Sequence, residues 1–102
     1  MLAMNTQVST IITIDHPAGL HARPAARFVT LAARFPCSIT VRKLNGSKPP
    51  VNAKSALGVL TLAVNQGDTV EIVAQGDQAQ EAISALIALI RHNFEESTTS
   101  HS

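Results

Sequence analysis

The stretch "VSTIITIDHPAGLHARPAARFV", Val8–Val29, decides the fold because its hydrophobic period changes partway along. Val8–Ile14 is rich in β-branched residues and predicts a strand. The Pro and Gly within Asp15–Gly19 predict a turn. Beyond it, apolar residues recur at helical spacing and predict a helix from Ala22 to about Arg34. The repeating positions are Ala25, Phe28, Val29 and Ala32.

Three further segments predict strands. Ser38–Lys43 and Thr69–Ala74 alternate apolar and polar residues, which indicates two half-buried strands. A short strand is expected at Val51–Ala53, after a hairpin signal at Asn45-Gly46. Two prolines precede this short strand, and proline cannot donate to a β-ladder. We therefore expect the short strand at an edge of the sheet.

Two more helices complete the order. Ser55 is a suitable N-cap for a short helix within Ser55–Val64. Asp77 is expected to cap a last helix. Its apolar stripe is Ala79, Ala82, Ile83, Leu86, Ile87 and Ile90. The predicted order is βαββαβα, an α+β sandwich with helices over one face of a small sheet. We expect one domain over residues 1–102, with a core at about 7–95, a frayed start at 1–6 and a polar tail at 96–102.

Composition narrows the classes of function. The 102 residues are 45% hydrophobic and include three Phe but no Trp or Tyr, so aliphatic side chains must build the core. The net charge is +1 without a basic cluster, which argues against nucleic-acid binding. The N-terminus lacks the pattern of a signal peptide, and no stretch approaches the roughly 18 apolar residues of a membrane span. A soluble, cytoplasmic domain is expected.

His21 and Arg23 lie where the predicted helix begins. Pro24 is tolerated in a first turn, because the N–H groups there have no intrahelical partner. The positive end of a helix favours a group that becomes negative. A neutral imidazole is a nucleophile, and a guanidinium fork suits phosphate oxygens. This arrangement favours transient carriage of a phosphoryl group on His21.

Other interpretations stay open from the residues alone. A histidine before a helix is often only a polar surface residue. His16 and His21 could suggest a metal pair, but a good third ligand is not nearby, so no metal site is expected. A Ser–His catalytic pair is compatible with the spacing, although nothing resembles a nucleophile elbow. Cys37 is the only cysteine, so it forms no internal disulfide, and we expect it to be a small buried apolar group.

"GLHARPAARFV" at Gly19–Val29 resembles the phosphorylation-site motif of HPr, the histidine-containing phosphocarrier of the bacterial sugar phosphotransferase system. "NAKSALGVLTLAV" at Asn52–Val64 resembles the family's regulatory-serine segment. Gln66–Leu86 resembles its last strand and last helix. The resemblance covers about residues 7–95. It implies an open-faced β-sandwich, with a four-stranded antiparallel sheet covered on one face by three helices.

The resemblance also implies roles for single residues. His21 matches the histidine phosphorylated on Nδ1, and Arg23 matches the arginine on its phosphate side. Ser55 matches the serine that a dedicated kinase phosphorylates in many Gram-positive members. Ala56, Leu57 and Leu60 match the apolar surface on which partners dock. The implied partners are enzyme I as donor, enzyme IIA domains as acceptors, and possible regulatory proteins. The chain would be a monomeric carrier without a cofactor, and not a turnover enzyme.

Two departures from the family pattern stand out. The loop before Ser55 carries about two extra residues, and Ala56 is smaller than the residue usual there, which trims the docking surface. Two alternative functions remain. One is a regulatory binding module switched at Ser55, and the other is a carrier in the nitrogen-related phosphotransferase branch. The pair His21 and Arg23 favours a carrier but does not separate the sugar branch from the nitrogen branch.

Overall fold

The computed structural model describes residues 6–95. Residues 1–5 of the start predicted to be frayed, 1–6, and the predicted polar tail at 96–102 lie outside the described residues. The elements are β1 (Gln7–Thr13), α1 (Ala22–Ala32), β2 (Ser38–Lys43), β3 (Val51–Asn52), α2 (Ala56–Thr61), β4 (Thr69–Gln75) and α3 (Ala79–Arg91). This is the predicted βαββαβα order. None of the helices between residues 6 and 95 is long and apolar enough to cross a membrane.

The four strands form one antiparallel sheet in the order β1-β4-β2-β3. β4 is the last strand in the chain, yet it lies between β1 and β2. Gln7 pairs with Gln75 at one end of the β1–β4 ladder, and Thr13 pairs with Thr69 at the other. The predicted edge position of the short strand is confirmed, since within residues 6–95 β3 pairs with β2 alone.

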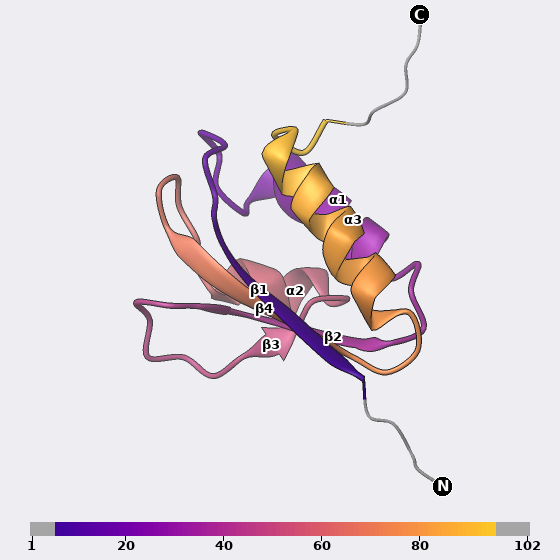
Figure 1. Ribbon diagram of the computed structural model, residues 1–102. Helices are drawn as coiled ribbons and strands as arrows, with labels where there is room; N and C mark the ends of the chain where they lie inside the picture. Colours follow the sequence, from indigo (N-terminus) through magenta and orange to yellow (C-terminus); the bar gives the residue numbers. More distant parts are fainter. Residues whose placement is uncertain (1–5, 96–102) are drawn as a thin grey trace, which may run out of the picture.

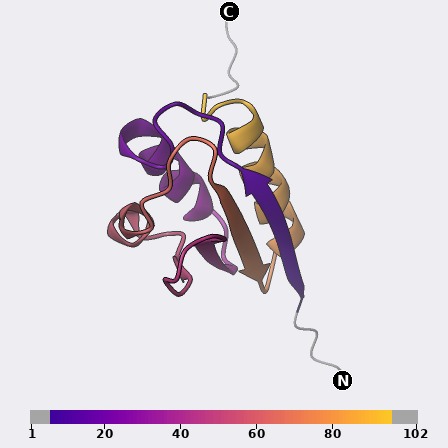
Figure 2. The same cartoon turned by 90° about the vertical axis from the view of Figure 1, so that its left-hand side faces the viewer.

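The helices cover one face of the sheet, where α1 and α3 lie side by side (Figures 1 and 2). β4 turns Val70, Ile72 and Ala74 into this layer, while Glu71 is directed outward and is bound by Arg42 at 2.7 Å. Alternation along the strand thus produces the apolar face on which the helices pack. The largest fully buried side chain is Phe28 of α1, so the predicted helical stripe does face the core.

Two predicted helix boundaries were wrong. α1 ends at Ala32 and not near Arg34, because the chain tightens there: the N–H of Arg34 bonds to the carbonyl of Leu31, three residues back. Asp77 does not cap α3. The N-cap is Gln78, which has a left-handed conformation with φ of 65° and makes no side-chain cap bond. A turn that follows Gly76 places Asp77 one residue too early.

Candidate functional site

His21 is the N-cap of α1, as predicted. Its backbone is extended, with φ of −127° and ψ of 162°, and its carbonyl accepts the first helical bond from the N–H of Ala25. The imidazole makes no cap bond to the helix. The ring is half-buried and points toward another segment of the chain. The side chain at this helix start is therefore not used to satisfy the helix.

The loop before His21 is fastened to the segment that follows α2. The N–H of Leu20 donates to the carbonyl of Val64 over 3.0 Å. Gly19 has φ of +63°, and a Cβ there would lie only 2.3 Å from the oxygen of Val64. The close approach and the positive φ both require glycine at this position. The motif glycine thus fixes where the chain enters α1.

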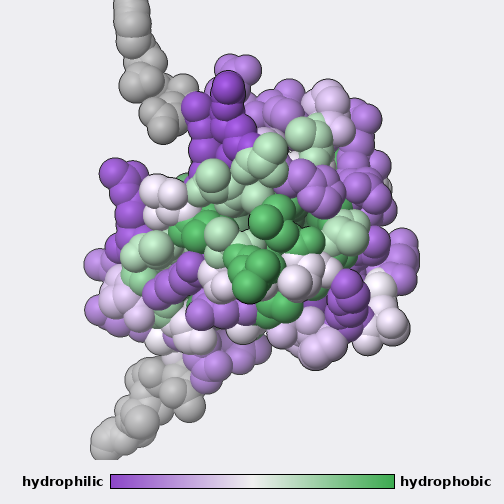
Figure 3. Space-filling model, turned by 180° about the vertical axis from the view of Figure 1, so that it is seen from behind, coloured by the Kyte–Doolittle hydropathy of each residue, from purple (hydrophilic) through white to green (hydrophobic). Residues whose placement is uncertain are grey.

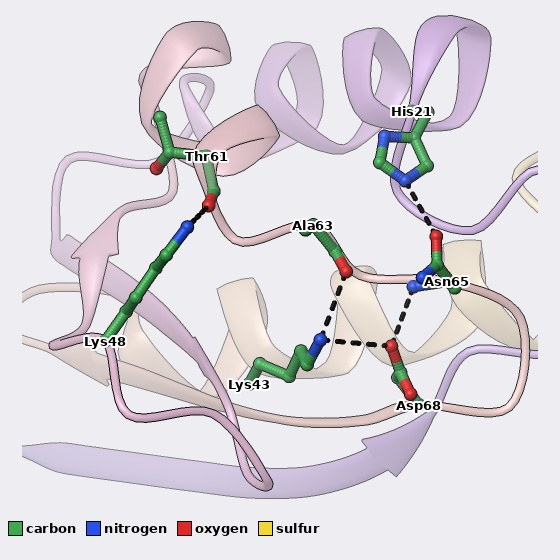
Figure 4. Close-up of polar contacts among 7 residues, drawn as sticks. All are labelled: His21, Lys43, Lys48, Thr61, Ala63, Asn65 and Asp68. Carbon is green, nitrogen blue, oxygen red and sulfur yellow. Dashed lines mark hydrogen bonds and ion pairs between the residues drawn. The ribbon is translucent and has the colours of Figure 1, made fainter.

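Asn65 holds the imidazole from the side. Nε2 of His21 lies 3.2 Å from Oδ1 of Asn65, and Nδ1 is on the other side of the ring (Figure 4). The sequence motifs assign no role to Asn65. The contact spans 44 positions, so no local pattern could have indicated it.

Asn65 is itself held by Asp68. The N–H of Asn65 donates to Oδ2 of Asp68 at 2.8 Å, and the N–H of Asp68 donates back to the carbonyl of Asn65 at 3.0 Å. Lys43 lies 3.6 Å from the Asp68 carboxylate and donates to the carbonyl of Ala63 (Figure 4). The bond from the Asn65 backbone and the charge of Lys43 lower the pKa of Asp68. Asp68 thus remains an ionised acceptor at neutral pH.

Arg23 lies in the first turn of α1 and is exposed, as expected for a residue that meets a ligand. It lines one part of a groove between α1 and α3, together with Arg27, Arg34 and His92. The guanidinium of Arg27 already has a partner within the protein, because its Nη1 donates to the carbonyl of Phe94 at 2.7 Å. The groove along α1 and α3 is thus lined by three arginines and by Glu95, and Arg23 is the arginine nearest the start of α1.

The start of α2 holds the remaining predicted site residues. Oγ of Ser55 accepts the N–H of Gly58 at 3.1 Å, which confirms the predicted N-cap. Leu57 is 75% exposed and Leu60 is 42% exposed. Apolar side chains gather on the face seen from behind (Figure 3), and α2 packs against α1. Ala56 is exposed beside them, so an apolar surface adjoins the serine.

His16 and Cys37 are the remaining candidate residues from the sequence. Nδ1 of His16 accepts the N–H of Ala18, and the His16 ring packs edge-on against Phe94 at 5.8 Å. Cys37 is buried, as predicted. Among residues 6–95, no group of three or more His, Cys, Asp or Glu side chains could hold a metal ion.

Comparison with known proteins shows to which family this chain belongs. Residues 8–92 match the model of the HPr component phosphorylation site of the phosphotransferase system. The chain belongs to the HPr family. It is 41% identical over 87 residues to the phosphocarrier protein HPr of Pseudomonas aeruginosa, covering 83% of this chain and 92% of that protein. HPr is a phosphocarrier of the phosphotransferase system, so the family chemistry is carriage of a phosphoryl group.

The chain is also similar to an HPr-like protein and to a solved HPr structure. The HPr-like protein Crh of Halalkalibacterium halodurans is 49% identical over 79 residues, which cover 78% of this chain and 90% of Crh. The crystal structure of HPr from Thermoanaerobacter tengcongensis superposes with a TM-score of 0.80 at 43% identity, covering 89% of this chain and 99% of that chain. The open-faced sandwich expected from the sequence is therefore confirmed.

Proposed function

We propose that His21 accepts a phosphoryl group from phosphorylated enzyme I and passes it to enzyme IIA domains in sugar uptake, in the cytoplasm. The observation that carries this proposal is the side chain of His21, which stands at a helix N-terminus without capping that helix. The imidazole is not engaged by its own helix, while the backbone around it is fixed. Membership of a phosphocarrier family supports the same assignment.

The transfer step uses groups already present at the start of α1. A ring nitrogen of neutral His21 attacks the phosphorus, the new N–P bond forms, and the bond to the donor breaks. The N–H groups of the first turn and the guanidinium of Arg23 then face the phosphoryl oxygens, which carry about two negative charges. Delivery to enzyme IIA is the same step in reverse, with His21 as the leaving group.

Labelled phosphoenolpyruvate with enzyme I tests the assignment. Wild-type protein should gain an acid-labile, base-stable label, and His21→Ala should gain none. His16→Ala is the matched control, because it removes another imidazole of the same loop and should label normally. Arg23→Ala should label more slowly while its stability changes by only about 0.5 kcal/mol, as for an exposed position. Labelling of His21→Ala at the wild-type rate would overturn the proposal. Enzyme I from the sugar branch and from the nitrogen branch, used in parallel, shows which donor this chain prefers.

We also propose that α2 is the regulated docking surface. Leu57 and Leu60 expose apolar side chains beside Ser55, as a partner-covered rim requires. A phosphate on Ser55 would place negative charge at a helix N-terminus, which the helix tolerates, but next to a surface that a partner must desolvate. Leu57→Lys should weaken binding to enzyme I, and Ser55→Asp should slow labelling of His21. If both variants are labelled and bound at wild-type rates, Ser55 is a structural cap only.

A further inference from the structure

The contact between His21 and Asn65 determines which ring nitrogen is nucleophilic. The Asn65 atom nearest the ring is Oδ1, at 3.2 Å from Nε2. A carboxamide oxygen can only accept a hydrogen bond, so with the amide in this orientation the contact fits a ring whose Nε2 carries the proton. In a neutral imidazole one nitrogen is protonated and the other holds the lone pair. The lone pair of His21 is therefore placed on Nδ1.

Several hydrogen bonds fix the position of Asn65. Two reciprocal bonds with Asp68 fix its backbone, and Lys43 binds both Asp68 and the carbonyl of Ala63 (Figure 4). The neighbouring Val64 holds the residue before the histidine, through the bond from the N–H of Leu20. The backbone and the ring of the site are thus bound by two successive residues, Val64 and Asn65, of one hydrogen-bonded segment. Such double attachment is what a preorganised reacting group requires.

We infer that Asn65 is a positioning residue that holds His21 in the Nε2–H tautomer, so that Nδ1 is presented to the incoming phosphoryl group. The inference rests on the proposed function for its phosphoryl step only. When Nδ1 attacks phosphorus, the N–P bond forms, the bond to the donor breaks, and positive charge develops on the ring. Nε2 keeps its proton throughout, and the Asn65 oxygen facing it stabilises that charge. The same hydrogen bond thus serves the free and the phosphorylated states.

The tautomer can be measured without any phosphoryl donor. We suggest long-range ¹H–¹⁵N spectra of the whole chain labelled at histidine, recorded at about pH 8.5, where an ordinary imidazole is neutral. Wild-type His21 should be mainly in the Nε2–H form. Asn65→Ala should shift the ring toward a mixture of tautomers, and Asn65→Asp should retain Nε2–H because it keeps an acceptor. Gln66→Ala is the matched control, since Gln66 binds the carbonyl of Asp15 and should leave the ring unchanged.

Phosphoryl transfer then gives a second readout. Asn65→Ala should be labelled about fivefold more slowly than wild type, the loss expected for one hydrogen bond. A wild-type ring in the Nδ1–H form would overturn the inference, because the amide would then be turned to donate from Nδ2. An unchanged tautomer in Asn65→Ala would overturn it as well. If the tautomers behave as expected but His21 takes no label, the proposed function fails and the positioning role of Asn65 stands.

Discussion

The N-cap residues of α1 and α2 have the same extended backbone, but their side chains are used differently. His21 and Ser55 are both extended N-caps, with φ of −127° and −109°. Oγ of Ser55 accepts a hydrogen bond from its own helix, whereas the ring of His21 turns away from its helix and binds Asn65. A capping side chain stabilises a helix by satisfying a free N–H. At α1 the position that corresponds to Gly58 is Pro24, which has no N–H, so a side-chain cap of this kind does not form there.

The start of α1 has no side-chain cap bond, and the loop before the helix holds it instead. Leu20 is fully buried and its N–H is bound to Val64, while Pro24 is buried in the first turn. The helix start is thus held by tertiary contacts around His21 and not by the side chain of His21. The side chain of His21 is therefore not needed to hold the start of α1.

Gly19→Ala should have the largest effect on stability. It disrupts the attachment of the loop before His21 to Val64, which holds the start of α1 in place of a side-chain cap. The new Cβ would lie 2.3 Å from the carbonyl oxygen of Val64, at a φ of +63°. We expect a loss of roughly 2–3 kcal/mol in urea denaturation, from the clash and the left-handed strain together. Gly67→Ala is the matched control: its φ is +92°, but nothing lies within 4 Å of the added Cβ. Equal losses in the two variants would show that the approach to Val64 is unimportant.

Ser55→Ala removes the side-chain cap that α2 has and α1 lacks. We expect a loss of about 1 kcal/mol in the free energy of unfolding, since the N–H of Gly58 loses its acceptor. Ser55→Asp keeps an acceptor and adds a negative charge that the helix N-terminus favours, so its melting temperature should be unchanged or slightly raised. A melting temperature for Ser55→Asp as low as that of Ser55→Ala would contradict the capping role.

His21→Ser tests whether α1 can take a side-chain cap at all. In α2 the serine hydroxyl accepts from the N–H three residues on, at Gly58, but the matching position in α1 is Pro24, which has no N–H. We therefore expect His21→Ser to be no more stable than His21→Ala in thermal unfolding, and both variants to lose the phosphoryl label completely. A stability for His21→Ser that exceeds that of His21→Ala by about 1 kcal/mol would show that the hydroxyl caps another N–H of the first turn.

The smallest expected effect is on the pH dependence of stability. It should differ between a variant of Asp68, which holds Asn65, and a variant of the Ser55 cap. The pKa of Asp68 is lowered in the folded state, so its stabilising contribution is complete above the ordinary aspartate pKa and is lost as pH falls through the lowered value. Asp68→Asn should therefore be less stable than wild type at neutral pH, and the difference should shrink as pH falls below about 4. Melting curves between roughly pH 7 and pH 2 measure it. The difference between wild type and Ser55→Ala should stay constant over that range, because the hydroxyl does not titrate.

The sequence predicted the helix starts that depend on local chemistry. Ser55 was found as a cap because serine followed by an apolar run is a local signal, and His21 was found through its motif. Asp77 failed as a cap because the turn after Gly76 delays α3 until Gln78, and side-chain type does not reveal that register. Asn65 was missed because its role depends on a contact between segments that only the folded sheet brings together.

The central place of β4 in the sheet also sets when the sheet can form. Within residues 6–95, β1 is translated first, and the strand with which it pairs, β4, is translated after β2 and β3. At roughly 5 to 20 residues per second, the ribosome needs on the order of 3 to 14 s to pass from Gln7 to its partner Gln75. Before that, β1 lacks the backbone partners of the β1–β4 ladder, and β2 has the two residues of β3 to bind. The sheet therefore assembles only after residue 75 has been translated, and a nascent chain stalled before residue 69 would carry the phosphorylation-site motif without the fold that orients it.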